Sequence, residues 1–251
     1  MSPALVAAVA GPQRSAAFRA RDRYRHPLET LSFFGLSPHM KVVEIWPGNG
    51  WYTEILAPLL NTNGLLVEAL PEETASPTTA ATASAKAAVS FSTKMAAAPA
   101  VYGKVVIVPF APPSFTDIRP PGGADLVLTF RNVHNWLKAG TSDAVFAAMF
   151  AALKPGGTLG VVEHRARPGT SLQQMIDTGY MTEDYVIQHA QAAGFRLVAR
   201  SEVNANPKDT TDHPNGVWSL PPGFAGGATD RQQFIDIGES DRMTLRFEKP
   251  R

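Results

Sequence analysis

The sequence predicts one α/β domain with a mostly parallel sheet and a helical extension at its N-terminus. Apolar, strand-like runs alternate with helix-like segments along the chain, which is typical of sheets whose strands are connected through helices. The early strands are apolar at nearly every position, as strands are when helices cover both faces of a parallel sheet. The last run, 242–248, alternates apolar and polar residues and follows another strand without a long helix between them. We therefore expect it to be antiparallel.

The composition limits what the protein can do. The chain has 251 residues, with 23 Lys and Arg against 22 Asp and Glu, and no Cys. A formal net charge of +1 gives no basic excess for nucleic acid or a membrane surface, so neither is expected as a partner. The absence of Cys excludes disulfides, thiolate metal sites and a cysteine nucleophile. No apolar run approaches the roughly 20 residues of a membrane-spanning helix.

The first 36 residues are expected to form a helical extension that covers the site, ahead of a core domain over 37–251. Residues 1–10 are apolar without a preceding Lys or Arg, which makes them a poor export signal. We expect a frayed tail and a cytoplasmic protein, with a trimmed export signal as the alternative because Ala8-Val9-Ala10 resembles a cleavage site. Pro27 and Gly35 suit the first turn and the end of a helix over 26–35.

The remaining elements follow in alternation. The predicted strands are 41–46, 64–69, 104–110, 124–130, 158–163, 195–203 and 242–248. The predicted helices after the extension are 52–60, 84–97, 142–153, which Gly156-Gly157 is expected to end, and 182–193. Two segments look like insertions into this core: 72–100 is rich in Ala, Thr and Ser, and 204–230 holds many of the Pro and Gly residues.

A glycine turn joins the first strand of the predicted core to its first helix, in the string Glu44-Ile45-Trp46-Pro47-Gly48-Asn49-Gly50. Glycines let the backbone pass close to a ligand, and the helix start then offers free N–H groups to it. Glu68 ends the next strand, where a carboxylate usually binds ribose hydroxyls. A dinucleotide fingerprint would require glycine at position 53, where Thr53 stands.

The turn resembles the first motif of class I S-adenosylmethionine (SAM)-dependent methyltransferases. That motif reads acid-x-Gly-x-Gly-x-Gly; Glu44, Gly48 and Gly50 match it, and Trp46 replaces the first glycine. This departure implies an altered floor under the methionine part of the cofactor. The string Pro-Gly-Asn-Gly-Trp-Tyr-Thr-Glu over 47–54 also resembles a group of bacterial predicted methyltransferases.

Two later segments extend the resemblance over residue 41 to the C-terminus. Residues 125–128 resemble the family's fourth strand, and 153–159 its L-K-P-G-G-x-L turn between helix and strand. The resemblance implies a Rossmann-like seven-stranded sheet with an antiparallel last strand and SAM as cofactor. The residues that we assign to the cofactor on this basis are Glu44, Trp46, Gly48, Gly50, Tyr52, Glu68, Phe110 and Arg131.

A candidate catalytic segment, 130–136, follows the fourth strand. Ligands bind at the carboxyl ends of strands in an open parallel sheet. The segment resembles the H-D-W segment of small-molecule O-methyltransferases, with Asn135 in place of Asp. Its histidine is the general base there, so the resemblance makes His134 the candidate, and histidine titrates near neutral pH as a base must. A role at a helix start and a metal ligand stay open as alternatives, and His164 and Arg131 are further catalytic candidates.

No metal site is expected, because His26, His134 and His164 show no H-x-x-x-H or similar spacing. The candidate substrate-binding residues are Tyr24, Arg25, His26, Trp136 and Arg165. The first three would belong to the lid, the tryptophan could offer an aromatic wall to a flat substrate, and Arg165 could bind a substrate carboxylate. A solvated charged face for the lid residues and an ion pair for Arg165 are the alternatives.

We therefore expect SAM-dependent methyl transfer to a small molecule, most simply onto a hydroxyl oxygen. The balanced charge argues against a nucleic-acid acceptor, and a homodimer is compatible with the sequence. The alternative is a SAM-binding protein of the same fold that transfers no methyl group, which Trp46 in place of glycine motivates. A nicotinamide-dependent enzyme is a weaker third interpretation.

Overall fold

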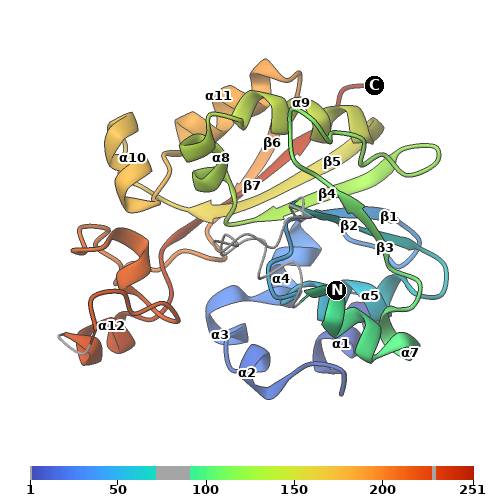
Figure 1. Ribbon diagram of the computed structural model, residues 1–251, viewed down its shortest axis with the longest axis horizontal. Helices are drawn as coiled ribbons and strands as arrows, with labels where there is room; N and C mark the ends of the chain where they lie inside the picture. The colour runs from blue at the N-terminus through green and yellow to red at the C-terminus, as the bar shows by residue number, and fades with distance from the viewer. Residues whose placement is uncertain (1, 72–90, 228–229) are drawn as a thin grey trace, which may run out of the picture.

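The computed structural model describes residues 2–71, 91–227 and 230–251. Its strands are β1 (Lys41–Ile45), β2 (Leu65–Leu70), β3 (Val106–Pro109), β4 (Ala124–Phe130), β5 (Leu153–His164), β6 (Arg196–Ser201) and β7 (Arg242–Glu248). They form one sheet in the order β3-β2-β1-β4-β5-β7-β6 (Figure 1). Strands β1 to β5 pair in parallel, and β7 runs antiparallel to both β5 and β6. The predicted mixed sheet with an antiparallel last strand is confirmed.

Helices cover both faces of this sheet (Figure 1). The helices on the side of the N-terminus are α1 (Pro3–Ala10), α2 (Ala16–Arg19), α3 (Asp22–Arg25), α4 (Pro27–Phe33), α5 (Thr53–Leu60) and α7 (Pro99–Tyr102). Those on the other side or at the far end are α8 (Val133–Ala139), α9 (Ser142–Ala152), α10 (Leu172–Thr178), α11 (Glu183–Ala192), the 3₁₀ helix η1 (Gly216–Ser219) and α12 (Arg231–Ile237).

The core lies in two layers, one on each face of the sheet. Val42 and Val43 are neighbours on β1, and both are fully buried. Val42 packs with Leu5 and Ile55 of the N-terminal side, whereas Val43 packs with Phe146 of the other side. A strand that alternates its side chains between two covered faces is apolar at most positions, which is why the early strands have that composition.

The N-terminal helix is part of the fold. Leu5 is 1% exposed and Ala8 is buried beside it in the core layer that contains α5. The expectation of a frayed tail is therefore wrong, because the apolar side chains of α1 have a surface to cover. No helix among the described residues is long and apolar enough to cross a membrane.

Several predicted boundaries move in the structure. Helix α9 ends at Ala152 and β5 begins at Leu153, so Gly156 and Gly157 lie inside the strand and do not end the helix. The register of β4 against β5 shifts between Ala124 and Leu126, and Gly156 has φ +77 in the same irregular part of β5. Of the predicted helix 84–97, residues 91–97 are helical and the rest lies outside the described residues.

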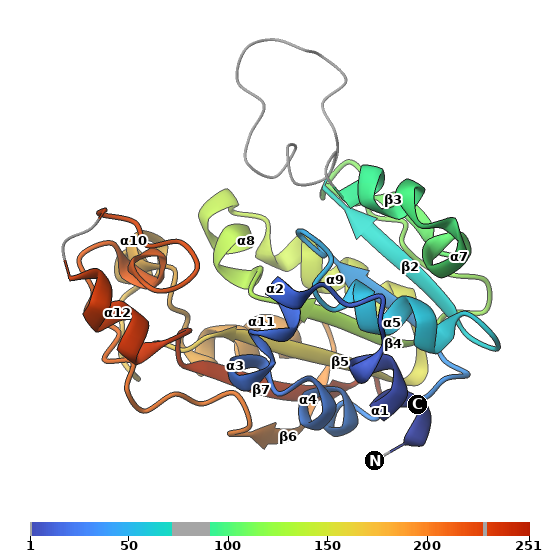
Figure 2. The same cartoon turned by 90° about the horizontal axis from the view of Figure 1, so that it is seen from below.

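The arrangement of the strands brings distant parts of the chain to one edge of the sheet. The carboxyl ends of the parallel strands β1, β4 and β5 meet there, and the start of the antiparallel β7 joins them. Helices α2 and α3 lie beside this edge, as the view turned by 90° shows (Figure 2). This edge is where an open α/β sheet binds its ligand.

Candidate active site

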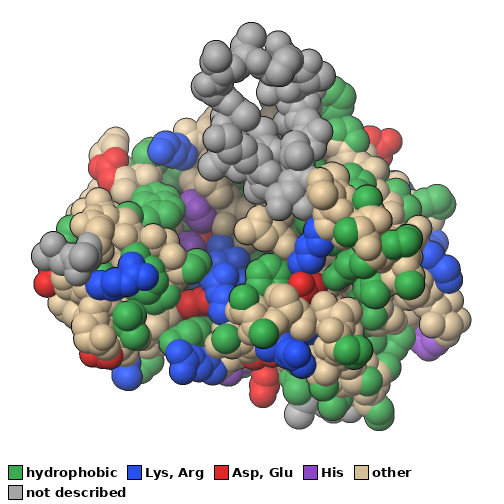
Figure 3. Space-filling view, turned by 60° about the horizontal axis from the view of Figure 1, so that its bottom comes forward, with side chains coloured by type: hydrophobic (Ala, Val, Ile, Leu, Met, Phe, Trp, Pro, Cys, Tyr) green, Lys and Arg blue, Asp and Glu red, His purple; other side chains and the backbone are tan. Residues whose placement is uncertain are grey.

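A cavity of about 450 Å³ opens at this edge, within the range of small-molecule sites. Its walls come from five places: the turn after β1, the end of β4, the junction of β5 with β7, the N-terminal helices and residues 217–223. On the face shown in Figure 3, basic side chains and histidines gather around a hollow.

The glycine turn keeps its shape although a tryptophan stands at its first position. Trp46 has φ +47, in the left-handed region that Gly48 and Gly50 also adopt at φ +60 and +76. Its indole Nε1 donates to the carbonyl of Phe110 at 3.0 Å, and its ring packs edge-on against Trp136 at 6.1 Å. These contacts hold a residue that would otherwise avoid this conformation.

The turn offers donors to a ligand. Gly48 and Asn49 line the cavity, and their N–H groups make no hydrogen bond to another described residue. A Cβ on Gly48 would meet nothing within 4 Å, so the backbone there faces open space. Free N–H groups before a helix start suit a carboxylate or another polar group, which fits the methionine part of SAM.

Two glutamates lie side by side under the turn. Glu44 lines the cavity and accepts a hydrogen bond from Thr53 Oγ1 at 2.9 Å. Glu68, in register with Glu44 on β2, is fully buried, and neither of its carboxylate oxygens has a hydrogen-bond partner among the described residues. Burial raises the pKa of Glu44 to about 7, and burial with the adjacent Glu44 raises the pKa of Glu68 well above its ordinary value.

Glu68 therefore does not occupy the position expected for a ribose-binding acid. Strand β2 continues to Leu70, so Glu68 lies inside the strand and not at its ligand edge. It is absent from the cavity wall. The prediction that Glu68 binds the cofactor is corrected on this ground.

His134 lies at the start of α8 with one nitrogen engaged. Its ring Nδ1 is 3.1 Å from Glu163 Oε1, and its backbone N–H donates to Glu163 Oε2 at 3.3 Å. The N–H groups of Val133 and His164 also donate to this fully buried carboxylate, at 2.5 and 2.8 Å. Because a carboxylate so placed only accepts, Nδ1 carries the proton in the neutral ring, and Nε2 is free to accept another.

His164 is the second histidine of the cavity. Its ring centroid lies 5.4 Å from that of His134, and its Nδ1 is 2.6 Å from Ser240 Oγ. Burial, followed by the nearby charges of His134 and Arg131, lowers the pKa of His164 well below its ordinary value. The ring is therefore neutral near pH 7 and available for hydrogen bonding to an uncharged or anionic ligand.

His134, Glu163 and His164 are close enough to hold a metal ion, with ligand atoms within 4.8 Å of one another. The Glu163 carboxylate is already occupied. It accepts hydrogen bonds from the backbone N–H groups of Val133, His134 and His164 and also contacts the His134 ring. A histidine oriented by a carboxylate describes this group better than a metal site. The structure does not add His26 to it, since His26 lies outside the cavity.

No family model matches the chain, and no curated protein matches it. Solved structures do. A SAM-dependent methyltransferase from Aquifex aeolicus aligns with a TM-score of 0.58 at 13% identity, covering 99% of both chains. The chain has the class I methyltransferase fold. The resemblance seen in the glycine turn is thus confirmed at the level of the fold.

Two further proteins with this fold differ in what they methylate. The glycopeptide N-methyltransferase MtfA in complex with SAM aligns with a TM-score of 0.53 at 14% identity, over 89% of this chain and 87% of that one. The arsenic(III) SAM methyltransferase CrArsM from Chlamydomonas reinhardtii aligns with a TM-score of 0.53 at 12% identity, over all of this chain and 74% of that one. The methyltransferase fold therefore does not fix the acceptor.

Of the remaining candidate site residues, some line the cavity and others lie outside it. Arg25, Tyr52 and Arg131 line the cavity, with Tyr52 stacked on Phe130 at 3.5 Å. Arg131 directly follows β4 and has φ +62, a left-handed conformation that aims the backbone toward the site edge. Phe110 is fully buried outside the cavity and contributes its carbonyl to Trp46.

Four of the substrate candidates are not in the cavity wall. Tyr24 and His26 line a second cavity of about 560 Å³, because the left-handed residue His26 turns the chain between α3 and α4. Trp136 is fully buried against Trp46 and Phe146. These three expectations of substrate contact are corrected.

Arg165 is the fourth. Its guanidinium binds Asp241 through Nε and Nη2 at 2.9 and 3.0 Å, and Nη1 pairs with Glu202 and Glu183. Every arm of the fork is thus engaged within the protein, and Arg165 does not line the cavity. The ion pair that was the alternative interpretation is the one that the structure shows.

The structure adds residues that the sequence reasoning missed. They are Arg21, Glu163, Trp218, Glu239 and Ser240, of which all but Glu163 line the cavity. Glu239 and Ser240 precede β7, and the start of an antiparallel strand lies at the same edge as the carboxyl ends of its parallel neighbours. This property of an antiparallel strand could have identified Glu239 and Ser240 as site residues from the sequence.

Proposed function

We propose that this protein transfers a methyl group from SAM to a hydroxyl oxygen of a small molecule, with His134 as the general base. The observation that carries the proposal is the pairing of His134 Nδ1 with the buried Glu163 at 3.1 Å, in the wall of the cavity that contains the glycine turn. A base whose far nitrogen is fixed by a carboxylate presents its other nitrogen in a defined tautomer and direction.

The proposed role of each residue follows from where it lies in the cavity. Gly48 and Asn49 would hold the amino-acid end of SAM through their free N–H groups, and Glu44 lies below them. When bound, SAM supplies an electrophilic methyl group on a sulfonium. His134 Nε2 would take the proton from the acceptor hydroxyl, the methyl group would pass to that oxygen with S-adenosylhomocysteine as the leaving group, and Glu163 would stabilise the positive charge that the ring gains. His164, held by Ser240, is placed to hydrogen-bond the acceptor.

A methyl-transfer assay with radiolabelled SAM and a panel of phenols and hydroxy acids tests the proposal. We expect transfer to at least one hydroxyl compound and none to the matched methyl ether, in which the oxygen is blocked. A protein that binds no SAM at all would contradict the proposal. Transfer to an amine analogue but not to the hydroxyl compound would contradict the choice of oxygen.

A protein that binds SAM without using it is the second candidate. Trp46 motivated it, because a bulky residue replaces the first glycine of the motif. The positive φ of Trp46 and its bond to Phe110 argue for a preserved turn, which favours the enzyme. Calorimetric titration with SAM and S-adenosylhomocysteine, run beside the turnover assay, separates the two: binding without turnover on the whole panel would favour the second.

A further inference from the structure

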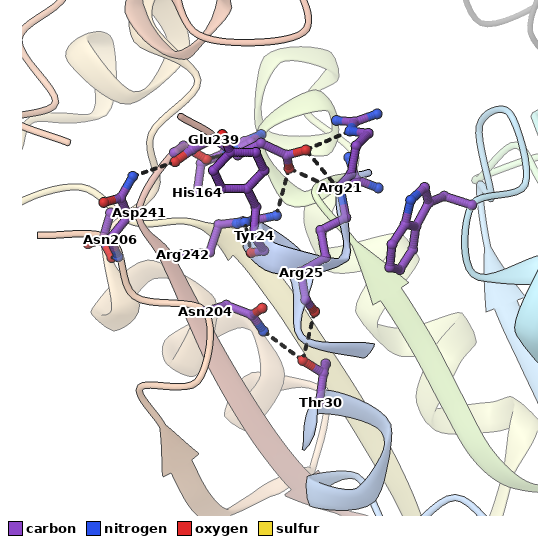
Figure 4. Close-up of polar contacts among 12 residues, drawn as sticks. Arg21, Tyr24, Arg25, Thr30, His164, Asn204, Asn206, Glu239, Asp241 and Arg242 are labelled. Carbon is purple, nitrogen blue, oxygen red and sulfur yellow. Dashed lines mark hydrogen bonds and ion pairs between the residues drawn. The ribbon is translucent and has the colours of Figure 1, made fainter. Parts of the chain in front are cut away.

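One carboxylate beside the cavity is surrounded by arginines. Glu239 accepts from Arg21 Nε at 2.6 Å, from Arg25 Nε at 3.0 Å and from Arg242 Nη1 at 3.1 Å. Figure 4 shows these side chains converging on it from α3 and its N-terminal flank and from β7. The arginines hold the pKa of Glu239 at about 2, and Arg131 contributes to that effect. Three arginines thus pair with a single carboxylate, and a fourth, Arg131, acts on it only through its charge.

These arginines keep unused hydrogen-bonding capacity. Nη2 of Arg21 and Nη2 of Arg25 are buried and have no hydrogen-bond partner among the residues that the structure describes, and the Arg25 side chain is only 1% exposed. Within the described part of the chain, no hydrogen bond or ion pair engages the guanidinium of Arg131. Burial lowers the pKa of Arg25 and of Arg131, and neighbouring arginines add to this effect. A buried guanidinium N–H group without a hydrogen-bond partner is costly unless a ligand supplies one.

The unsatisfied arginines face the proposed reaction. Arg21, Arg25 and Arg131 line the same cavity as His134 and His164. Arg131 and Arg25 are also among the charges that lower the pKa of His164. The excess positive charge therefore lies next to the histidine pair and is not dispersed over the surface.

Among the described residues, Glu239 is the carboxylate that pairs with these arginines, and its single negative charge does not balance four positive ones. Two other nearby carboxylates are engaged elsewhere: Glu163 by backbone N–H groups and His134, and Asp241 by Arg165. Burial raises the pKa of Glu44 to about 7, which disfavours its anionic form. SAM would bring a positive sulfonium, and its ammonium and carboxylate cancel. An anionic acceptor would supply the missing negative charge.

Another part of the cavity wall is apolar. Val217, Trp218, Leu220, Pro221 and Pro222 line it. Trp218 is 40% exposed, and its ring lies 6.2 Å from that of His134 in an edge-on arrangement. An exposed aromatic ring that faces a cavity suits the flat, apolar body of a ligand.

We propose that the acceptor is a hydroxy compound with an apolar body and an oxyanion group, a carboxylate or a phosphate, that Arg21, Arg25 and Arg131 bind. This inference rests on the proposed function, because it takes the ligand of this cavity to be a methyl acceptor. The anion would complete the hydrogen bonds of Nη2 of Arg21 and of Arg25 and pair with Arg131, while the apolar body lies against Trp218 and the hydroxyl reaches His134. Bidentate binding of carboxylate or phosphate is what guanidinium groups favour.

Binding measurements with matched probes test the proposal. The probes are 4-hydroxybenzoate, 4-hydroxyphenyl phosphate and the uncharged 4-hydroxybenzamide, titrated by calorimetry with and without saturating S-adenosylhomocysteine. We expect an anion to bind about tenfold or more tightly than the amide. The carboxylate and phosphate arms show which of the two oxyanions the site takes.

The variants assign the preference to the arginines. Arg131→Asn, chosen because Asn tolerates positive φ, and Arg25→Gln should reduce the preference for the anion to about twofold or less, while S-adenosylhomocysteine affinity stays the same. Arg131→Lys should restore part of the preference because it keeps the charge. Arg19→Gln, on the exposed Arg19 of α2, is the matched control and should behave as the unmodified protein.

Three outcomes would overturn the proposal. The amide could bind as well as both anions, or no anion could bind below about 10 mM. The Arg131 and Arg25 variants could instead lose S-adenosylhomocysteine binding and keep the anion preference, which would assign the arginines to the cofactor. A protein that binds no S-adenosylhomocysteine rejects the proposed function separately, since the titrations without it still decide whether the arginines select an anion.

Discussion

His134 is the side chain on which the proposed chemistry depends. We expect His134→Ala to lower the methyl-transfer rate by about two to four orders of magnitude, the usual contribution of a general base. Affinity for S-adenosylhomocysteine should hardly change, because His134 is not part of the glycine turn. His39→Ala, on an exposed loop histidine, serves as the control. An unchanged rate in His134→Ala would remove this residue from the mechanism.

Glu163 acts through His134, so its variant should show a dependence on that histidine. Glu163→Gln keeps one acceptor oxygen but can no longer compensate the charge of the His134 ring. We expect turnover to fall by about 10- to 100-fold and the pH profile of turnover to change with it. The double variant Glu163→Gln/His134→Ala should be no slower than His134→Ala alone. Additive losses would instead indicate a general structural defect.

The same geometry bears on metal dependence. The Glu163 oxygens accept from the N–H groups of Val133, His134 and His164 as well as from the His134 ring. We therefore expect a chelator such as EDTA to leave the methyl-transfer rate unchanged and added Zn²⁺ not to raise it. Loss of activity with EDTA and recovery with Zn²⁺ would show that His134, Glu163 and His164 bind a metal.

Residue positions could be predicted from the sequence where strand order alone decides them. His134 and His164 follow or end neighbouring parallel strands, and the structure places their rings 5.4 Å apart. Trp136 was misplaced because two residues along the helix α8 turn its side chain away from His134 and into the core. The pairing of Arg21 and Arg25 with Glu239 could not be found, because these partners lie more than 200 residues apart in sequence.

The turn after β1 shows how an element accommodates a residue that its local conformation disfavours. Trp46→Gly would relieve a positive φ but remove the bond to Phe110 and the packing on Trp136. Truncation of a large buried aromatic costs about 3–5 kcal/mol and the strain about 1, a difference of about 2–4 kcal/mol. We expect a net loss near the lower end, about 2 kcal/mol in the free energy of unfolding, because Trp46 is only partly buried. Urea denaturation measures it.

Two further measurements complete the test on Trp46. Affinity for S-adenosylhomocysteine should stay within a small factor, because Gly48 and Asn49 carry the free N–H groups. Trp218→Ala, on a partly exposed ring of η1, is the stability control and should cost much less. A more stable Trp46→Gly variant would show that strain at this position outweighs the packing.

Elements could be predicted where their pattern is long or fully apolar. The ranges 124–130 and 242–248 agree with β4 and β7 to the residue. The helices α8, α10 and α12 were missed, and each has seven residues, which is too short for a helical period to show above chance. The sequence predicts a helix end at Gly156-Gly157, where the structure has the irregular start of β5. Paired glycines are compatible both with a helix end and with an irregular strand.

At the scale of the whole molecule, two glutamates give stability opposite dependences on pH. Glu239 has its pKa lowered from 4.5 to about 2, so its contribution of ~3 kcal/mol is present above pH 4.5 and is lost as the pH falls through about 2. Glu44 has its pKa raised to about 7. Between pH 4.5 and 7 the unfolded chain binds fewer protons there than the folded one, so the free energy of unfolding falls as the pH rises.

Urea denaturation at intervals from about pH 3 to 8 should therefore show a maximum near pH 4.5 to 5 for these two contributions. Glu239→Gln should flatten the acidic side of the profile. Glu68→Gln, which removes one carboxyl of the buried pair, should flatten the side above pH 5. The lowered pKa of His164 adds a rise with pH in both proteins. A profile above pH 5 that is the same in Glu68→Gln as in the unmodified protein would therefore contradict the account of Glu44 and Glu68.

The net charge of the whole chain hides this local arrangement. A formal charge of +1 shows no basic excess of the kind that a polyanionic acceptor would favour. The structure gathers four arginines around Glu239 next to a cavity of about 450 Å³. A sum over the sequence cannot register such a concentration, because it depends on which charges the fold brings together.

The antiparallel β7 has a consequence for how such a protein could diversify. It returns residues 239–240 to the mouth of the site, where residues 21–25 from the other end of the chain meet them. The glycine turn over 46–50 belongs to neither of these two segments. If these two terminal segments bind the acceptor as we propose, exchanging them for those of another protein of this fold would alter acceptor choice and leave the glycine turn intact.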